Sequence, residues 1–304
     1  MPFLVGWHFY FRRQWLGIFN YFHRMNYVSV NGKMLAANKP VLLADNRGYR
    51  YGDGLFETMK LVNGELILAK YHFERLFSGL KLMQFRIPSL FTPARLLKEI
   101  LTLCKKNDCT RLARIRLSVF RGNGGLYDET KGLQYLIECW PVSASVNQFN
   151  KNGLDIDIYP HAQKSCDLFC NIKSANFLPY VMAAQYAKAN KLNDCLINNV
   201  KGHIADATIA NIFLVKNNLV ITPSLSEACV NGVMRRHLIE KLRASPKFEL
   251  REGVVTKNDL ETFDEVFLTN AINGIRWVKS FRNKVYTNAQ TIQLFRDFIV
   301  PLYG

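Results

Sequence analysis

The chain has 304 residues, of which 49% are hydrophobic and 21% charged, so it can bury a large core and has the composition of an ordinary globular protein. Two domains are the natural expectation for this length. The net charge is +16, but the basic residues are spread along the whole chain without a basic tail or an aromatic-basic motif, which argues against a nucleic-acid binder. The seven cysteines contain no CxxC pair, so we expect no metal site, no disulfide framework and a reducing, cytoplasmic location.

Residues 1–24 are rich in aromatic side chains and contain no acidic residue. Arg12 and Arg13 divide their apolar part into pieces too short to span a bilayer, and the cleavage region of a secretory signal is missing. We therefore expect translation to start at Met25, which would make residues 1–24 an extension. The alternative is an amphipathic anchor that lies in a membrane interface. The intact mass of the native protein distinguishes the two.

Turn signals dominate the stretch from residue 27 to residue 75. The dipeptides Asn31-Gly32 and Asn63-Gly64 each stand between short apolar runs, which is a strong hairpin signal. Between them, residues 50–58 read RYGDGLFET. The two glycines of this motif indicate backbone that approaches another group closely. A helix is predicted to begin near His72 and to carry Arg75.

A helix over residues 93–105 and a strand over residues 111–120 are predicted next. In the strand, Arg114, Arg116 and Ser118 share one face, while apolar side chains share the other. Two arginines on an otherwise apolar strand are either solvent-facing charges or a trap for a carboxylate. The polar segment 141–152 predicts the linker between two domains, residues 25–145 and 146–304.

The stretch 170–213 has a single lysine near its start and an aspartate near its end. Lys173 is expected where a strand ends and a helix begins, at which point chains often place reactive side chains over a pocket. A desolvated lysine can lose its proton and attack a carbonyl group. The predicted elements are a strand ending at Lys173, a helix over 175–190, a strand over 195–199, a turn at 201–202 and a strand entering 211–213.

Two further segments predict anion sites. Gly232 and Val233 are expected to begin a helix that continues through Leu242, and free N–H groups at a helix start bind an anion without a basic side chain. Asn270 and Ala271 follow a predicted strand over residues 265–268.

Taken in this order, the motifs resemble the class IV aminotransferases, a family of pyridoxal-phosphate (PLP) enzymes of fold type IV. The resemblance runs from about Met25 to Leu294. It rests on RYGDGLFET, the segment YHFERL around Arg75, the Lys-Ser-x-Asn sequence at Lys173, GHIADATIANIF around Asp206, CVNGVMR at 229–235 and the Thr-Asn-Ala sequence ending at Ala271.

The resemblance implies a two-domain α+β fold like that of D-amino-acid aminotransferase, with PLP in the cleft between the domains. The family is usually a homodimer whose loops complete each other's sites. Lys173 would hold PLP as a Schiff base, and Thr58 is a candidate for handling a proton nearby. The remaining assignments are Arg75, Asp206, Gly232, Val233, Asn270 and Ala271 for the cofactor, and Arg116, Arg114 and Tyr51 for an amino or carboxylate substrate.

The reaction itself has more than one interpretation. The motif GDGLFET and the Asn270-Ala271 dipeptide are most like 4-amino-4-deoxychorismate lyase, an enzyme of folate biosynthesis that forms 4-aminobenzoate and pyruvate. Leu126 is a departure, because D-amino-acid aminotransferases and some of these lyases have an arginine there. The alternative is an amino-acid transaminase of the branched-chain type. Asp206 is a second departure, because the family usually has glutamate at this position, and it motivates a third hypothesis, a non-catalytic PLP-binding protein.

Overall fold

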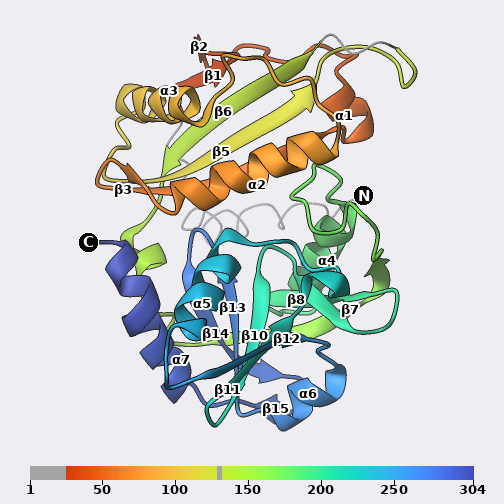
Figure 1. Cartoon of the computed structure of the whole chain (residues 1–304), viewed down its shortest axis with the longest axis vertical. Helices are drawn as coiled ribbons and strands as arrows, with labels where there is room; N and C mark the ends of the chain where they lie inside the picture. The colour runs from red at the N-terminus through yellow and green to blue at the C-terminus, as the bar shows by residue number, and fades with distance from the viewer. Residues whose placement is uncertain (1–24, 129–131) are drawn as a thin grey trace, which may run out of the picture.

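The structure, a computed structural model, describes residues 25–128 and 132–304. The expectations for residues 1–24 lie outside these ranges. Two β-sheets organise the described chain and lie one above the other along its long axis (Figure 1). No helix in these two ranges is long and apolar enough to cross a membrane.

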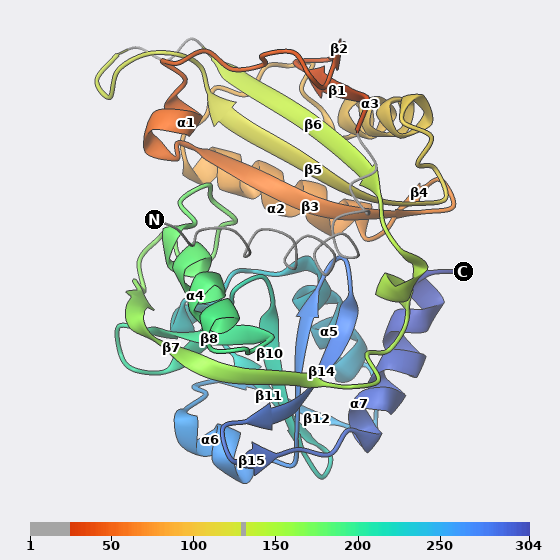
Figure 2. The same cartoon turned by 180° about the vertical axis from the view of Figure 1, so that it is seen from behind.

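The first sheet has six antiparallel strands in the order β2-β1-β6-β5-β3-β4. Helices α2 and α3 cover one of its faces, and Figure 2 shows the opposite face. The elements are β1 (Tyr27–Val30), β2 (Lys33–Ala36), α1 (Arg47–Tyr51), β3 (Gly54–Val62), β4 (Glu65–Leu66), α2 (Ala69–Leu82), α3 (Pro93–Lys106), β5 (Leu112–Arg121) and β6 (Leu133–Pro141).

Both predicted hairpins are confirmed. Asn31 and Gly32 have φ values of 51° and 84°, and they join β1 to β2. Asn63 and Gly64 have φ values of 50° and 85°, and they join β3 to β4. Positive φ at both central residues is the geometry that matches the right-handed twist of the flanking strands, and asparagine and glycine adopt it most readily.

Strand β5 shows the predicted alternation of side chains, and its neighbour β3 is paired with it in register. Their apolar positions, such as Met59 and Ile115, belong to the core that α2 and α3 complete. The other face carries polar and charged side chains between the apolar ones, and the register places Thr58 opposite Arg116 and Lys60 opposite Arg114. A row of cations therefore lies on the face that the two helices leave open.

The second sheet has nine strands in the order β12-β11-β10-β13-β14-β7-β8-β9, with β15 paired to β14. Its strands are β7 (Leu154–Lys164), β8 (Asp194–Asn199), β9 (Ile204–Ala207), β10 (Asn211–Lys216), β11 (Leu219–Pro223), β12 (Glu249–Gly253), β13 (Glu265–Asn270), β14 (Gly274–Phe281) and β15 (Lys284–Val285). Its helices are α4 (Leu178–Ala189), α5 (Val233–Arg243), α6 (Lys257–Thr262) and α7 (Ala289–Leu294).

The segment between the two sheets runs from the end of β6 to the start of β7 and contains one short 3-10 helix, Ala144–Asn147. The polar sequence of this segment agrees with its place between the sheets. The domain boundary at residues 145 and 146 stays a prediction.

The predicted strand that ends at Lys173 is wrong. Residues 165–177 form a loop, in which only Ser174 makes a β-bridge, to Leu55. The following helix, α4, begins at Leu178 rather than at residue 175, and Pro179 lies in its first turn. The apolar residues before Lys173 resemble a strand in sequence, but the backbone groups of this loop bond partly within the loop, as Ile172 does to Phe169, and partly to segments far away in the sequence.

Three cysteines that are far apart in the sequence come together in the first half. Cys104, Cys109 and Cys139 are buried in the core beneath α3, with their sulfur atoms within 4.8 Å of one another. The spacing of these residues gave no sign of the cluster, because Cys139 reaches it from β6.

Candidate active site

A cavity of about 460 Å³ is lined by residues of both sheets. It receives side chains from β3, β5 and α2 of the first half and from the loops around β9, α5 and β13 of the second half. The structure brings together ten of the eleven residues that the sequence singled out. They are Thr58, Arg75, Arg114, Arg116, Lys173, Asp206, Gly232, Val233, Asn270 and Ala271.

Lys173 has the environment of a nucleophilic amine. Burial and, to a smaller extent, the neighbouring Arg75 lower the pKa of Lys173 from 10.5 to about 7. The Lys173 ammonium also lies 4.5 Å from the ring centroid of Phe56 and 5.5 Å from that of Phe177. A lysine with this pKa supplies a large neutral fraction at neutral pH, which is the form that attacks a carbonyl.

The loop that carries Lys173 is held by backbone hydrogen bonds to both halves of the chain. On the side of β3, the N–H of Phe56 donates to the carbonyl of Lys173 at 3.0 Å, and the N–H of Ala175 donates to the carbonyl of Gly54 at 2.8 Å. On the other side, the N–H of Asn231 donates to the carbonyl of Asn171 at 2.9 Å. The lysine backbone is therefore fixed without a strand of its own.

Arg75 reaches the cavity from α2 and is oriented by Glu57. Nε of Arg75 lies 2.8 Å from Oε1 of Glu57, and Nη2 lies 2.5 Å from Oε2. Nη1 of the same guanidinium donates to the carbonyl of Asn231 at 3.0 Å. Nδ1 of His72 lies 2.6 Å from the Glu57 carboxylate. Burial acts to raise the pKa of Glu57, but Arg75 and His72 outweigh it and lower this pKa to about 2.

The start of α5 is an open helix N-terminus at the cavity. Gly232 is the N-cap residue, and no side chain caps the helix. A Cβ atom at Gly232 would overlap Oδ1 of Asn211, whose side-chain amide donates to the carbonyl of Val230 at 2.8 Å. Only glycine leaves room for this contact, and the helix N–H groups with their partial positive charge remain available to an anion.

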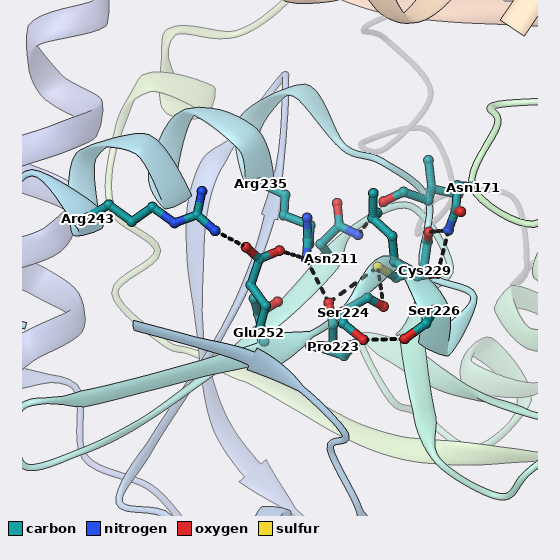
Figure 3. Close-up of polar contacts among 12 residues, drawn as sticks. Asn171, Asn211, Pro223, Ser224, Ser226, Cys229, Arg235, Arg243 and Glu252 are labelled. Carbon is teal, nitrogen blue, oxygen red and sulfur yellow. Dashed lines mark hydrogen bonds and ion pairs between the residues drawn. The ribbon is translucent and has the colours of Figure 1, made fainter. Parts of the chain in front are cut away.

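Side chains around the start of α5 hold the loop that leads into the helix (Figure 3). The amide of Asn171 donates to the carbonyls of Leu225 and Cys229 at 2.8 and 2.7 Å. Arg235 donates to the carbonyl of Pro223 at 2.8 Å and to Glu252 at 2.6 Å. The helix start is thus tied to the segment that precedes Lys173.

The turn after β13 forms another part of the cavity wall. The side-chain oxygen of Asn270 accepts hydrogen bonds from the N–H groups of Ile272 and Asn273 at 3.0 and 2.9 Å. The hydroxyl of Thr269 donates to the carbonyl of Gly274 at 2.7 Å. Asn270 therefore shapes the turn that presents Ala271.

Asp206 is buried at the cavity wall and is firmly held. Its Oδ2 lies 2.9 Å from Nζ of Lys164 and 2.9 Å from the backbone nitrogen of Val230. The hydroxyl of Tyr180 lies 3.3 Å from Oδ1 and 3.2 Å from Oδ2. Because three of these four contacts involve Oδ2, Oδ1 is the oxygen with capacity left for a group in the cavity.

Arg114 and Arg116 lie side by side on β5 and both line the cavity. Burial lowers the pKa of each guanidinium, and Glu138 opposes this shift from the neighbouring strand. Neither arginine has a carboxylate within 4.0 Å among residues 25–128 and 132–304. Arg116 instead lies 3.9 Å from the ring centroid of Phe56, and Nε of Arg114 is buried without a hydrogen-bond partner.

Tyr51 is the predicted residue that the structure does not bring to the cavity of its own chain. It is the last residue of α1, and its side chain is 45% exposed. Gly52 adopts a left-handed conformation, with φ at 65°, and turns the chain into β3. This turn leaves Tyr51 outside while Phe56 and Thr58 face the cavity.

The model of the family described as "Amino-transferase class IV" matches residues 54–281 of this sequence. The chain belongs to the class IV aminotransferase family. An aminodeoxychorismate lyase of Vibrio harveyi is 28% identical over 233 residues, which cover 76% of this chain and 83% of that protein. A D-alanine aminotransferase of Bacillus licheniformis is also 28% identical, over 250 residues that cover 80% and 84%.

Among solved structures, a branched-chain aminotransferase of Thermoproteus uzoniensis has a TM-score of 0.83, covers 91% of this chain and 95% of its own, and is 20% identical. The chain therefore has the predicted PLP fold type IV, and as a member of the class IV aminotransferase family it is a PLP-dependent enzyme. Its own cavity fits the cofactor, since it combines an amine of lowered pKa, a buried carboxylate and an uncapped helix start with no room for a side chain at Gly232.

Several residues that shape the site were missed by sequence reasoning. Glu57 stands inside the recognised motif, next to Thr58, but its side chain points to the opposite face of β3, where it meets Arg75. Lys164 and Tyr180 surround Asp206 from two different elements. Of these residues, only Glu57 is marked by the sequence, because a carboxylate in the middle of an apolar strand needs a charged partner.

Proposed function

We propose that this enzyme is a lyase that converts 4-amino-4-deoxychorismate into 4-aminobenzoate and pyruvate. The observation that supports this substrate is the pair Arg114 and Arg116, two guanidinium groups at the cavity that have no carboxylate within 4.0 Å in the described chain. The two products each keep one carboxylate, so the substrate has two. Each arginine offers a fork of N–H donors to one of them.

In this proposal, Lys173 is the catalytic base and acid. Bound PLP supplies an aldehyde for the amine and an electron sink for the substrate carbon. With the cofactor bound, the free Lys173 amine would take the proton from that carbon and would give a proton to the departing enolpyruvyl group, which leaves as pyruvate. Phe56 and Phe177 flank this amine and exclude water from one side. Thr58, which lines the cavity directly opposite Arg116 in the strand register, is proposed to assist the proton transfer.

The phosphate is proposed to bind between three elements. Arg75 contributes a guanidinium that Glu57 and the carbonyl of Asn231 already orient. The N–H groups at Gly232 and Val233 contribute the positive end of α5. The turn at Asn270 and Ala271 closes the third side. We assign Oδ1 of Asp206 to the pyridine nitrogen, since Oδ2 is occupied by Lys164 and Val230.

A transaminase of the branched-chain type is the second candidate. The observation that favours it is the apolar part of the cavity wall, where Phe177, Val181 and Ile209 could pack against an aliphatic side chain. In that case one of the two arginines would bind the only carboxylate of the amino acid. The relatives named above bear the names of three different enzymes, at 28%, 28% and 20% identity, and this low overall similarity does not decide between the candidates.

The test begins with absorbance spectra of the wild-type enzyme and of Lys173→Ala, each mixed with PLP. We expect a visible band that depends on Lys173, and its absence from the wild type would overturn the cofactor assignment. The wild type is then assayed with 4-amino-4-deoxychorismate and, separately, with a panel of amino donors and 2-oxoglutarate. Formation of 4-aminobenzoate supports the lyase, whereas keto-acid formation with no 4-aminobenzoate supports the transaminase.

We also propose that the enzyme is a cytoplasmic homodimer. Leu178, Val181 and Met182 form an exposed apolar face on α4, which a second copy could cover. Tyr51 is then proposed to reach the substrate in the cavity of the partner copy. The seven free cysteines support a reducing location. Sedimentation of wild type and Met182→Glu checks the dimer, and a wild-type monomer at working concentration would contradict it.

A further inference from the structure

Lys60 is a buried lysine whose ammonium joins three separate parts of the chain. It lies on β3 with 0% of its surface exposed. Its Nζ donates to the carbonyl of Ile272 at 2.8 Å, lies 3.5 Å from the carbonyl of Val146 and is 3.7 Å from the ring centroid of Tyr303. These partners belong to the cavity turn after β13, to the segment between the sheets and to the C-terminal end.

The Lys60 ammonium has no carboxylate within 4.0 Å in the part of the chain that the structure describes. Burial accordingly lowers the pKa of Lys60 from 10.5 to about 7. Two carbonyl oxygens and an aromatic face replace part of the lost hydration. An apolar side chain would fill this volume without the cost of desolvating a charge. The contribution specific to the lysine is therefore its hydrogen bonding to the two carbonyl groups.

The peptide between Ile272 and Asn273 shows what this hold achieves. The carbonyl of Ile272 is fixed by Lys60, and the N–H of Asn273 donates to the side chain of Asn270 at 2.9 Å. In a trans peptide these two groups point in opposite directions from one plane. Both polar ends of that plane are therefore anchored, one to the first sheet and one to the turn itself.

Tyr303 closes the remaining side of this arrangement. Its ring covers the ammonium, and a Cβ atom at Gly274, the residue after the turn, would come within 2.9 Å of its hydroxyl oxygen. The C-terminal end thus packs against both Lys60 and the base of the turn.

We propose that Lys60 is a positioning residue that holds the turn 270–273 in its anion-binding shape by anchoring the carbonyl of Ile272 to the first sheet. This role rests on the proposed function, in which the turn contacts the cofactor phosphate. Lys60 itself contacts neither cofactor nor substrate and acts through the turn.

The test compares Lys60→Met with Lys60→Arg in the cofactor-free full-length protein at pH 6, where the wild-type ammonium is charged. Amide hydrogen exchange in residues 270–274 is measured against the segment 233–238 of α5 as an internal reference. We expect exchange in the turn to become about tenfold faster in Lys60→Met, which corresponds to the loss of one hydrogen bond from a charged group. Lys60→Arg should retain part of the protection.

Two further measurements sharpen the test. The dissociation constant for PLP should rise about tenfold in Lys60→Met, and Tyr303→Leu, which removes only the aromatic face, should produce a smaller rise in the same direction. The Lys173-dependent visible band should persist in all three variants at saturating PLP. Its absence from the wild type would overturn the proposed function and not the role of Lys60 in shaping the turn.

Unchanged exchange in the turn of Lys60→Met would overturn the inference. So would equally faster exchange in the turn and in the α5 reference, because that result would mean general destabilisation rather than a local hold.

Discussion

Nζ of Lys164 and Oδ2 of Asp206 form an ion pair at 2.9 Å, with both side chains more than nine-tenths buried. This pair anchors the aspartate to which we assign the pyridine nitrogen of the cofactor. Tyr180 and the N–H of Val230 complete its shell. A short carboxylate with so many partners has little freedom to move, so the position of Asp206 is set by the protein rather than by the cofactor.

Replacing Lys164 by methionine should leave the Asp206 carboxylate buried without its cation. We expect the free energy of unfolding to fall by about 3–5 kcal/mol, the usual cost of breaking a buried pair from one side. Urea unfolding of the cofactor-free protein measures this loss. Lys201→Met is the matched control, because the ammonium of Lys201 is half exposed and lies 3.7 Å from Glu227, and it should cost less than about 1 kcal/mol. Equal losses in the two variants would refute the prediction.

Gly232→Ala should weaken cofactor binding. The new methyl group would overlap the side chain of Asn211, which must then give up its hydrogen bond to Val230 and disturb the start of α5. We expect the dissociation constant for PLP, measured by absorbance titration, to rise at least about tenfold, equivalent to about 1.4 kcal/mol. Gly253→Ala is the control, because no atom lies within 4 Å of its added methyl. An unchanged constant in Gly232→Ala would count against the anion site.

Glu57→Gln should loosen Arg75, because a neutral amide holds a guanidinium less strongly than a carboxylate does. The expected rise in the PLP dissociation constant is about tenfold, from a weakened charge-assisted hydrogen bond worth about 1.5–3 kcal/mol. The control is Glu74→Gln, which changes an exposed carboxylate on α2, the helix that carries Arg75. It should have little effect on the PLP dissociation constant. If both variants bound PLP like the wild type, the proposed orientation of Arg75 by Glu57 would be wrong.

The same residue predicts a pH dependence of stability. The pKa of Glu57 is about 2 in the folded protein and 4.5 in an exposed glutamate. The unfolded chain therefore binds a proton more readily, and the stabilisation by Glu57 is complete above pH 4.5 and is lost as the pH falls toward 2. Urea unfolding at pH 5 and pH 3 should show a smaller loss for Glu57→Gln than for the wild type. Equal losses would contradict the low pKa.

Lys173→Met should stabilise the cofactor-free protein near neutral pH. The pKa of Lys173 is lowered to about 7 in the folded chain and is 10.5 when exposed. The unfolded chain then binds the extra proton between these values, so stability rises with pH through this window. Methionine has no amine to deprotonate on burial. We therefore expect the free energy of unfolding at pH 7 to rise by more than about 1 kcal/mol, since one pKa unit is worth ~1.4 kcal/mol. The difference in the free energy of unfolding between Lys173→Met and the wild type should become smaller toward pH 10. A difference that stays constant with pH would contradict the prediction.

Much of the fold was predictable because its signals are local. The geometry of each Asn-Gly turn depends on only two residues, both with positive φ. The alternation of side chains in β5 places Arg114 and Arg116 on the face opposite the core. The start of α5 at Gly232 was predictable for the same reason. The loop before Lys173 was predicted as a strand because its apolar residues look alike in both states, and the partners that decide between them, Gly54 and Asn231, are distant in sequence.

The candidate site was predictable as a set of residues but not as a set of contacts. The motifs identified Arg75, Lys173 and Asp206. No local sequence pattern showed that Glu57 orients Arg75 or that Lys164 pairs with Asp206. Each pair forms only when separate elements pack together. Tyr51 lies outside the cavity of its own chain although it is close to Phe56 in the sequence, so its assignment to the substrate stays a prediction.

The absence of a strand at Lys173 has a consequence for folding. The loop is hydrogen-bonded to β3, more than 100 residues earlier, and to the loop before α5, more than 50 residues later. Closing such long segments is slow compared with forming a local turn or helix. We therefore expect the lowered pKa of Lys173 to arise late in folding, after these distant segments have come together around the loop.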